Sequence, residues 1–262
     1  MNAARSDVDL DIILPVYRNG ATLTEMITRI DRSMDEAGLS YRVIFVVDAS
    51  PDDSWERVRT LARQYPQVTG ILHASNQGQH RAILTGLRHS TARWAAFLDA
   101  DLQDPPEQLP LLMTTGQGEQ CTVFALRQGR YQSGGRMISS RVFKRLLGWL
   151  IDLPATAGTY VLLPHATAVR MCEAPVRHPQ AVVLARLCSD QWTGVPFDRL
   201  VRPAGESAYT SRARWRAAWR SLRCVFEFRS SVQREPSPAP ARPGNSPRSL
   251  TGDAVIAASV NL

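Results

Sequence analysis

The most informative stretch for the fold of this chain is one in which acidic residues follow a short apolar run, Phe97-Leu98-Asp99-Ala100-Asp101-Leu102-Gln103-Asp104-Pro105-Pro106. Trp94–Leu98 is expected to be a strand, and the proline pair turns the chain away after it. Ligands of open parallel sheets bind beyond the carboxyl ends of the strands. Two carboxylates with a nearby amide oxygen suit a hard cation such as Mg²⁺ or Mn²⁺. A short D-x-D pattern also occurs in solvated acidic loops, so the pattern alone leaves both interpretations open.

Outward from this run, apolar strands and amphipathic helices alternate over the first half of the chain. Strands are expected at Val8–Val16, Tyr41–Val47, Val68–His73 and Trp94–Leu98. Helices are expected between them at Ala21–Ala37, Ser54–Tyr65 and Gly78–His89. Regular alternation with short connections predicts an α/β fold, in which helices cover both faces of a mostly parallel sheet.

The pattern changes after Pro106. Further strands are expected at Cys121–Leu126, Tyr160–Leu163 and Gly194–Val201, and helices at Met137–Ile151 and Ser211–Phe228. From Ser231 onward five prolines break all periodicity. Residues 231–262 are therefore predicted to form a disordered tail.

Length and composition limit the class of protein. A chain of 262 residues with 44% hydrophobic content can bury one substantial core. No apolar run approaches the roughly 18 residues that span a bilayer, and the N-terminus lacks the order of a signal peptide. The expected location is cytoplasmic, either in solution or peripheral on the inner face of the membrane. Four scattered cysteines without C-x-x-C spacing indicate reduced thiols.

The formal net charge of +7 favours phosphate-rich ligands, nucleic acid or an anionic membrane surface as partners. No segment resembles a helix-turn-helix, an RRM or a zinc finger, so no nucleic-acid partner is expected. Within residues 211–228, an apolar stripe accompanies many arginines; its members are Trp215, Trp219, Leu222 and Phe226. This helix either lies on anionic lipid or packs its stripe on the rest of the protein, and the sequence leaves both open.

Five segments, in order, resemble family 2 glycosyltransferases of the GT-A fold, and in particular the polyprenyl-phosphate sugar synthases (the dolichol-phosphate-mannose synthase and bactoprenol glucosyltransferase group). The first three are Ile12–Tyr17, Val46–Ser54 and the N-x-G segment that starts at Asn76. The other two are Asp99–Pro106 and the R-x-x-G-x-S-x-Y segment Arg202–Tyr209.

This resemblance implies one GT-A domain over residues 1–230, with a donor-binding half at about 8–126 and an acceptor-side half at about 127–230. It implies metal-dependent, inverting transfer of a sugar from a nucleotide-sugar donor to a polyprenyl phosphate. Mg²⁺ or Mn²⁺ would bind Asp99, Asp101 and Gln103, and the donor would contact Pro15, Tyr17, Asp48 and Asp99. Catalysis would involve Asp101, Arg127 and Arg136, and the acceptor phosphate would contact Arg136, Ser140, Arg202, Ser207 and Tyr209.

The chain departs from the family pattern mainly on the acceptor side. Thr159 stands where an Asp is common and Val161 where an Arg is common. Val47 replaces an Asp or Asn, and Ala208 replaces a lysine. Two alternatives therefore stay open: the same donor chemistry on a soluble acceptor in polysaccharide or secondary-metabolite synthesis, and a non-catalytic GT-A scaffold subunit. Whether the chain forms an oligomer also stays open.

Overall fold

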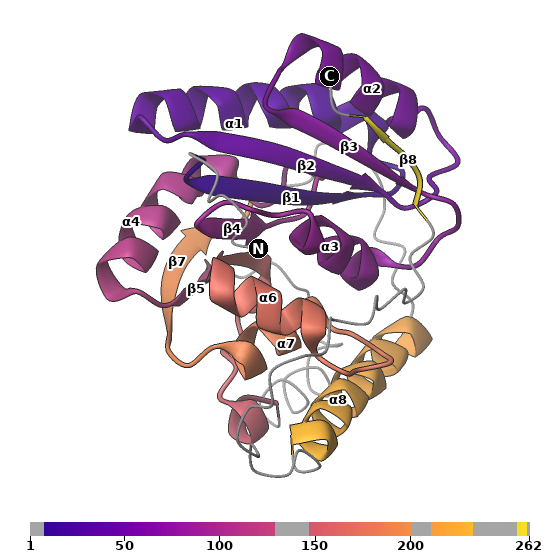
Figure 1. The fold of residues 1–262 in the computed structure, drawn as a ribbon. Helices are drawn as coiled ribbons and strands as arrows, with labels where there is room; N and C mark the ends of the chain where they lie inside the picture. Colours follow the sequence, from indigo (N-terminus) through magenta and orange to yellow (C-terminus); the bar gives the residue numbers. More distant parts are fainter. Residues whose placement is uncertain (1–7, 129–146, 201–210, 233–255, 261–262) are drawn as a thin grey trace, which may run out of the picture.

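A computed structural model describes residues 8–128, 147–200, 211–232 and 256–260. Its described strands form one eight-stranded sheet in the order β7-β5-β6-β4-β1-β2-β3-β8. Helices cover both faces of this sheet (Figure 1). Only β6 and β8 run antiparallel to their neighbours. The predicted α/β fold with a mostly parallel sheet is confirmed.

The first half has the predicted alternation throughout. It runs β1 (Leu10–Val16), α1 (Leu23–Ala37), β2 (Tyr41–Val47), α2 (Ser54–Gln64), β3 (Val68–His73), α3 (Gln79–Arg88) and β4 (Trp94–Phe97). The observed β2 and β3 match their predicted ranges residue for residue. The other boundaries differ by one or two residues, because helix and strand ends depend on local hydrogen bonding rather than on the apolar pattern.

The second half contains three helices that the pattern did not predict. It runs α4 (Leu109–Glu119), β5 (Thr122–Gln128), β6 (Ala157–Pro164), α6 (His165–Glu173), α7 (Ala181–Cys188), β7 (Trp192–Asp198), α8 (Ser211–Val232) and β8 (Ile256–Val260). The helices α4, α6 and α7 are short, and α4 contains two glycines that weaken its helical signal. Of the helix predicted at Met137–Ile151, the described residues 147–151 are helical.

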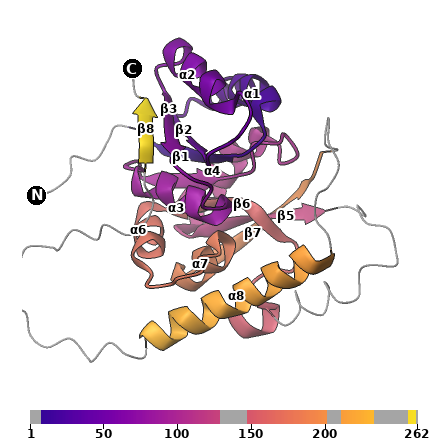
Figure 2. The same cartoon turned by 90° about the vertical axis from the view of Figure 1, so that its right-hand side faces the viewer.

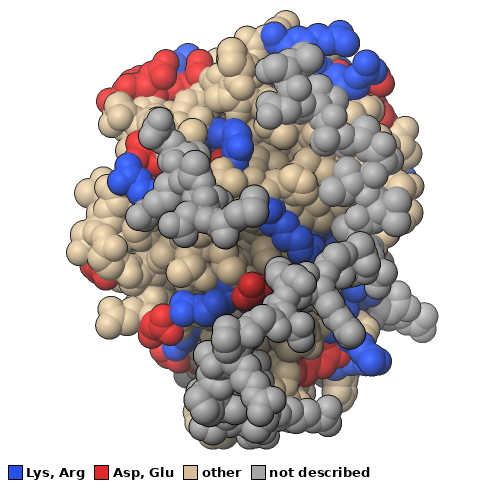
Figure 3. Space-filling view, in the orientation of Figure 1, with Lys and Arg blue, Asp and Glu red and all other residues tan. Residues whose placement is uncertain are grey.

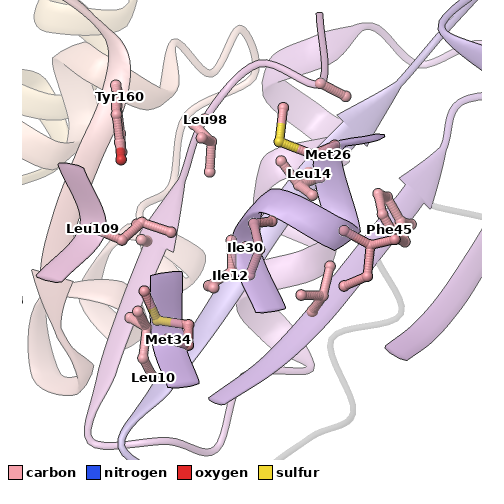
Figure 4. Packing of buried hydrophobic residues seen from close by; sticks show 14 of the residues in the cluster. Leu10, Ile12, Leu14, Met26, Ile30, Met34, Phe45, Leu98, Leu109 and Tyr160 are labelled. Carbon is pink, nitrogen blue, oxygen red and sulfur yellow. The ribbon is translucent and has the colours of Figure 1, made fainter. Parts of the chain in front are cut away.

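Side chains of each central strand alternate between two hydrophobic clusters. On β1, Leu10, Ile12 and Leu14 pack with Met26 and Ile30 of α1 (Figure 4). The intervening Ile13 belongs to the cluster on the opposite face, which contains residues of α3, α6 and α7. Both faces of the sheet are therefore covered, as expected for a parallel sheet. Each fully buried Leu or Ile contributes about 1.5–3 kcal/mol to this core.

The prediction of a disordered tail does not hold at Ile256–Val260. These residues form β8, which pairs antiparallel with β3 and sets Gly70 opposite Val260. The segment follows the last proline of the tail and contains β-branched residues. It can therefore supply hydrogen bonds to the outer edge of β3, which would otherwise lack a neighbouring strand.

Within the described part of the chain, we find no helix with the length and apolar character needed to cross a membrane. Cys121, Cys172, Cys188 and Cys224 are all unpaired, which agrees with the prediction of reduced thiols. On the face shown in Figure 3, acidic and basic side chains are interspersed from one end of the molecule to the other.

Candidate active site

The acidic run begins where β4 ends, at the carboxyl edge of the parallel strands. β4 pairs antiparallel with β6, with Phe97 opposite Val161. Asp99 follows Phe97 by two residues, and Thr159 precedes Val161 by two, so that the Thr159 hydroxyl donates a 2.7 Å hydrogen bond to Oδ2 of Asp99. The Gln79 side-chain amide, at the start of α3, donates to Oδ1 of Asp99. Asp99 is thus oriented by two neutral donors from opposite sides.

The surroundings of Asp99 oppose its negative charge, although its side chain remains 22% exposed. Burial raises the pKa of Asp99 to about 6, with further contributions from the nearby carboxylates of Asp104 and Asp101. The Thr159 hydrogen bond and the Arg127 guanidinium act in the opposite direction. A carboxylate crowded by two others is stabilised by a nearby cation.

Asp104 connects two arginines from different parts of the chain. The Asp104 side chain is fully buried. Its Oδ2 accepts a 3.0 Å hydrogen bond from Nη2 of Arg127, and its Oδ1 accepts a 3.1 Å bond from Nε of Arg199. Arg127 lies near the end of β5 and Arg199 directly follows β7, and these strands are parallel neighbours. Nη2 of each arginine also lies 3.9 Å from Oδ2 of Asp99.

The guanidinium of Arg127 lies against the backbone of Gly158 on β6. A Cβ atom at position 158 would stand 2.5 Å from Cζ of Arg127, closer than non-bonded atoms approach. Glycine therefore allows this close approach. Nε of Arg127 is buried and has no hydrogen-bond partner in the structure as described. This nitrogen is enclosed beside Gly158 and cannot reach a ligand.

Asp101 and Gln103 continue the loop beyond Asp99. Asp101 is buried, and its Oδ1 accepts a 3.2 Å hydrogen bond from the Gln103 backbone amide. Leu102 between them has a φ of 61°, so the loop makes a tight left-handed turn. The carbonyl of Gln103 accepts a 2.9 Å bond from the amide of Leu200, which ties this loop to the segment that carries Arg199.

The side chains predicted to bind a metal offer suitable donors. Carboxylates and amide oxygens, here from Asp99, Asp101 and Gln103, are the ligands that Mg²⁺ and Mn²⁺ prefer. The crowding that raises the pKa of Asp99 also favours a cation at this place. A search over the described residues finds no group of three or more His, Cys, Asp or Glu side chains that could hold a metal ion. The donor chemistry fits the ion, and the assignment remains a proposal.

Asp48, at the end of β2, holds the loop that follows β3. Its two oxygens accept 2.7 Å hydrogen bonds from the backbone amides of Gln77 and Gly78. Nδ1 of His73 lies 2.8 Å from Oδ1, and Nε2 of His73 lies 3.1 Å from the Thr85 hydroxyl. Burial raises the pKa of Asp48, but these hydrogen bonds outweigh burial and leave it below its usual value. Gly78 has a φ of 87°, a conformation that favours glycine.

Pro15 and Tyr17, predicted to contact the nucleobase, lie at the carboxyl end of β1. Pro15 is buried and stands opposite Val46 of β2. The Tyr17 side chain is exposed, and the Arg18 guanidinium carbon lies 5.5 Å from its ring centroid. Tyr17 can therefore contact a ligand from the carboxyl edge of the sheet.

The structure places Nη2 of Arg127 3.9 Å from Oδ2 of Asp99, whose loop also carries Asp101 and Gln103, and the roles predicted for these four residues stay predictions. Arg136, Ser140, Arg202, Ser207 and Tyr209 lie outside the described residues, so their roles stay predictions. Gln79, Arg199 and the anchoring role of Asp104 were not predicted from the sequence. Arg199 was not recognised as a site residue because the predicted strand extended to Val201. In the structure β7 ends at Asp198, and Arg199 begins the connection that follows it.

The sequence of residues 11–167 matches the family described as Glycosyl transferase family 2. That match covers more than half of the chain. The chain belongs to glycosyl transferase family 2. The carboxyl edge that carries Asp99 lies within the matched region.

Curated relatives of this member of glycosyl transferase family 2 include two undecaprenyl-phosphate 4-deoxy-4-formamido-L-arabinose transferases. The protein from Erwinia tasmaniensis is 31% identical over 207 residues, which cover 77% of this chain and 63% of the relative. The protein from Edwardsiella ictaluri is 30% identical over 203 residues, which cover 76% and 62%. The chain thus spans less than two thirds of the length of these relatives.

Solved structures support the GT-A fold. Mannosyl-3-phosphoglycerate synthase from Rubrobacter xylanophilus has a TM-score of 0.63 at 15% identity, over 90% of this chain and 79% of that one. Glucosyl-3-phosphoglycerate synthase from Mycobacterium tuberculosis, solved with Mn²⁺, UDP and glucosyl-3-phosphoglycerate, has a TM-score of 0.59 at 17% identity, over 88% and 82%. A mannosyltransferase from Pyrobaculum calidifontis, solved with GDP-Man and Mn²⁺, has a TM-score of 0.57 at 19% identity, over 88% and 68%.

Proposed function

We propose that this glycosyltransferase moves a sugar from a nucleotide-sugar donor to a polyprenyl phosphate, with a divalent cation and with inversion at the anomeric carbon. The observation that carries the proposal is the cluster at the carboxyl edge of β4, where three carboxylates and two arginines converge. The names of the curated relatives support undecaprenyl phosphate as the acceptor class.

On the donor side, Pro15 and Tyr17 would contact the base, and Asp48 would keep the loop at Gln77 and Gly78 in place. Asp99, Asp101 and Gln103 would hold Mg²⁺ or Mn²⁺. When bound, such an ion offsets the charge that develops on the departing diphosphate. Asp99 would already be oriented for binding the ion, because Thr159 and Gln79 donate hydrogen bonds to its two oxygens.

Arg127 and Arg199 would bind phosphate oxygens beside the reacting centre. One buried carboxylate, Asp104, holds both guanidiniums and uses only part of their hydrogen-bonding capacity. Guanidinium groups bind phosphate oxygens through paired hydrogen bonds. Donors fixed in place before the reaction stabilise developing negative charge without further reorganisation.

A phosphate acceptor would let the enzyme work largely by positioning and charge stabilisation. A phosphate monoester is largely anionic near neutral pH, so positioning it against the donor supplies most of the catalysis. Thr159 stands where relatives often carry an acid, and it donates to Asp99 rather than accepting a proton from a substrate. The presence of Thr159 in place of this acid also favours the second candidate, transfer to a soluble acceptor.

The decisive experiment screens donors and acceptors together. The full chain is incubated with Mn²⁺, a panel of UDP-, GDP- and dTDP-sugars, and either undecaprenyl phosphate in detergent or water-soluble acceptors. Nucleoside diphosphate release and the mass of the product are measured, and NMR of the product gives the anomeric configuration. Asp101→Asn should abolish turnover, whereas exposed Asp190→Asn serves as the matched control.

The outcomes separate the candidates. Turnover only with undecaprenyl phosphate supports the proposal, and turnover only with water-soluble acceptors supports the second candidate instead. Bound donor without transfer to any acceptor would favour the scaffold interpretation. Unchanged turnover in Asp101→Asn, or in the presence of excess EDTA, would overturn the metal assignment.

A further inference from the structure

The helix α8 packs on the protein through one face. Cys224 and Val225 are buried in the cluster that also contains α3, α6 and α7. Glu227 accepts hydrogen bonds from the backbone amides of Arg177 at 2.8 Å and His178 at 3.1 Å, and lies 3.0 Å from Nδ1 of His178. The helix is therefore fixed in orientation, and its packing face is settled by these contacts.

The opposite face of α8 carries aromatic residues in solvent. Trp219 is 61% exposed and Phe226 is 66% exposed. They are seven residues apart, so two helical turns bring them onto one side, and Arg223 lies on the same side between them. Trp219 and Phe226 therefore do not pack on the protein, which was one of the two roles left open for the apolar stripe of this helix.

A third exposed aromatic belongs to a segment that is adjacent to α8. Trp149, in the short helical segment 147–151, is 82% exposed. Arg229 of α8 donates a 2.7 Å hydrogen bond to the carbonyl of Leu150, so the segment and the end of α8 are adjacent (Figure 2). We call the exposed side chains of Trp149, Trp219, Arg223 and Phe226 the aromatic–arginine face.

The charge of α8 identifies the kind of partner. Its sequence, Ser211–Val232, contains six arginines and one acid, Glu227. That acid is already engaged by Arg177 and His178, on the side of the helix that meets the protein. Arg220 and Arg223 are exposed, and Arg223 lies on the same side of the helix as Trp219 and Phe226. Aromatic rings surrounded by arginines are suited to the headgroup region of a bilayer, where the rings bury apolar area and the guanidiniums meet phosphates.

We propose that the aromatic–arginine face binds the surface of an anionic lipid bilayer, with Trp149, Trp219 and Phe226 entering the headgroup region and Arg223 contacting lipid phosphate. This contact is peripheral and uses side chains from two separate segments. It stands on these exposures and charges alone, and it holds whichever acceptor the enzyme uses.

Vesicle flotation of the full chain tests the proposal. Binding is measured with vesicles of phosphatidylcholine alone and with vesicles that contain phosphatidylglycerol. Strong binding is expected only with phosphatidylglycerol, and it should weaken as salt is raised. Arg223→Ala should weaken binding about fivefold, the effect of one basic residue near a charged membrane. The double change Trp219→Ala with Phe226→Ala should weaken it by roughly tenfold or more.

Matched controls exclude general effects. Leu111, 50% exposed on α4, and Arg59, whose side chain is 41% exposed on α2, lie on other helices. Leu111→Ala and Arg59→Ala should bind vesicles as the unchanged protein does. Trp149→Ala should weaken binding as a single aromatic change on α8 does, which tests whether the two segments share one surface. Thermal unfolding of each variant shows that it is folded.

The proposal is overturned by equal binding to both kinds of vesicle, by no binding to either, or by variants that bind as well as the controls. It is also overturned if the aromatic variants convert a dimer into a monomer in light scattering while the unchanged dimer ignores vesicles, because the face would then join two copies. None of these measurements depends on catalysis, so the result of the donor screen and the result of the vesicle experiments are independent of each other.

Discussion

Arg127 and Arg199 bind different oxygens of one buried carboxylate, that of Asp104, at 3.0 Å and 3.1 Å. The two arginines are separated by more than seventy residues of sequence and come together because β5 and β7 are parallel neighbours. This arrangement holds two positive groups beside Asp99 at equal distances, and it makes Arg199 a candidate phosphate ligand that the sequence analysis did not identify.

Replacing Arg199 should impair transfer more than stability. In Arg199→Ala, Asp104 keeps its bond to Arg127, so the fold should survive. Loss of charged hydrogen bonds to phosphate, about 1.5–3 kcal/mol, corresponds to a fall in kcat/KM of roughly 10- to 150-fold. Arg199→Lys should restore only part of this, because an ammonium cannot make paired bonds. Arg59→Ala, on α2, is the control, and equal kinetics in Arg199→Ala would exclude the role.

Adding one methyl group to Gly158 should displace Arg127. The new Cβ would lie 2.5 Å from Cζ of Arg127, so the guanidinium must move away from Asp104. We expect Gly158→Ala to lower kcat/KM at least tenfold, and to add little to the defect of Arg127→Ala in the double variant. Gly118 on α4 has open space at its Cβ position, so Gly118→Ala should leave kinetics unchanged. Additive defects in the double variant would contradict this explanation.

Asp48 is expected to act by holding the loop at Gln77 and Gly78. Asp48→Asn replaces one acceptor oxygen with a donor, so at least one of the two 2.7 Å bonds to backbone amides is lost. Hydrogen exchange of the amides at 77 and 78 should become faster, and the KM for the donor should rise several-fold with a smaller change in kcat. If Asp48 instead contacts the base directly, preference among nucleotide bases will change while exchange in this loop stays slow.

The attachment of α8 should depend on pH through Glu227. Burial raises the pKa of Glu227, but hydrogen bonds from His178 and the Arg177 amide outweigh burial and hold it below 4.5. A lowered folded-state pKa means that its stabilisation is present above pH 4.5 and is lost as pH falls below that value. Near pH 6, Glu227→Gln should lower the free energy of unfolding by about 1–2 kcal/mol.

Urea unfolding of both proteins between pH 3 and pH 6 measures this difference. The difference should shrink as the pH falls below 4.5, because the native Glu227 becomes protonated as the pH approaches its lowered pKa. Glu56→Gln, which changes an exposed acid on α2, should show no such trend. A difference that is constant with pH would show that the charge of Glu227 does not contribute.

Much of the donor half could be predicted from the sequence. Apolar runs of period two and helices of period 3.6 placed β1 to β4 and α1 to α3 within two residues, because each pattern lies within one segment. The run from Asp99 to Gln103 was recognisable because a strand delivers its acids to a defined edge of the sheet. The short helices α4, α6 and α7 were missed because packing, rather than their own sequence, stabilises them.

Local patterns of residues are enough to predict the α/β alternation, the acidic loop after β4 and the amphipathic character of α8. Three other features could be seen only in the folded domain: the contact of Thr159 with Asp99, the pairing of Arg199 with Arg127, and the side of α8 that is exposed. The first two depend on the antiparallel pairing of β6 with β4 and the parallel pairing of β5 with β7. The third depends on Glu227 and Cys224 finding partners elsewhere in the chain. Contacts between distant segments form from the packing of the whole domain, and no local pattern of residues encodes them.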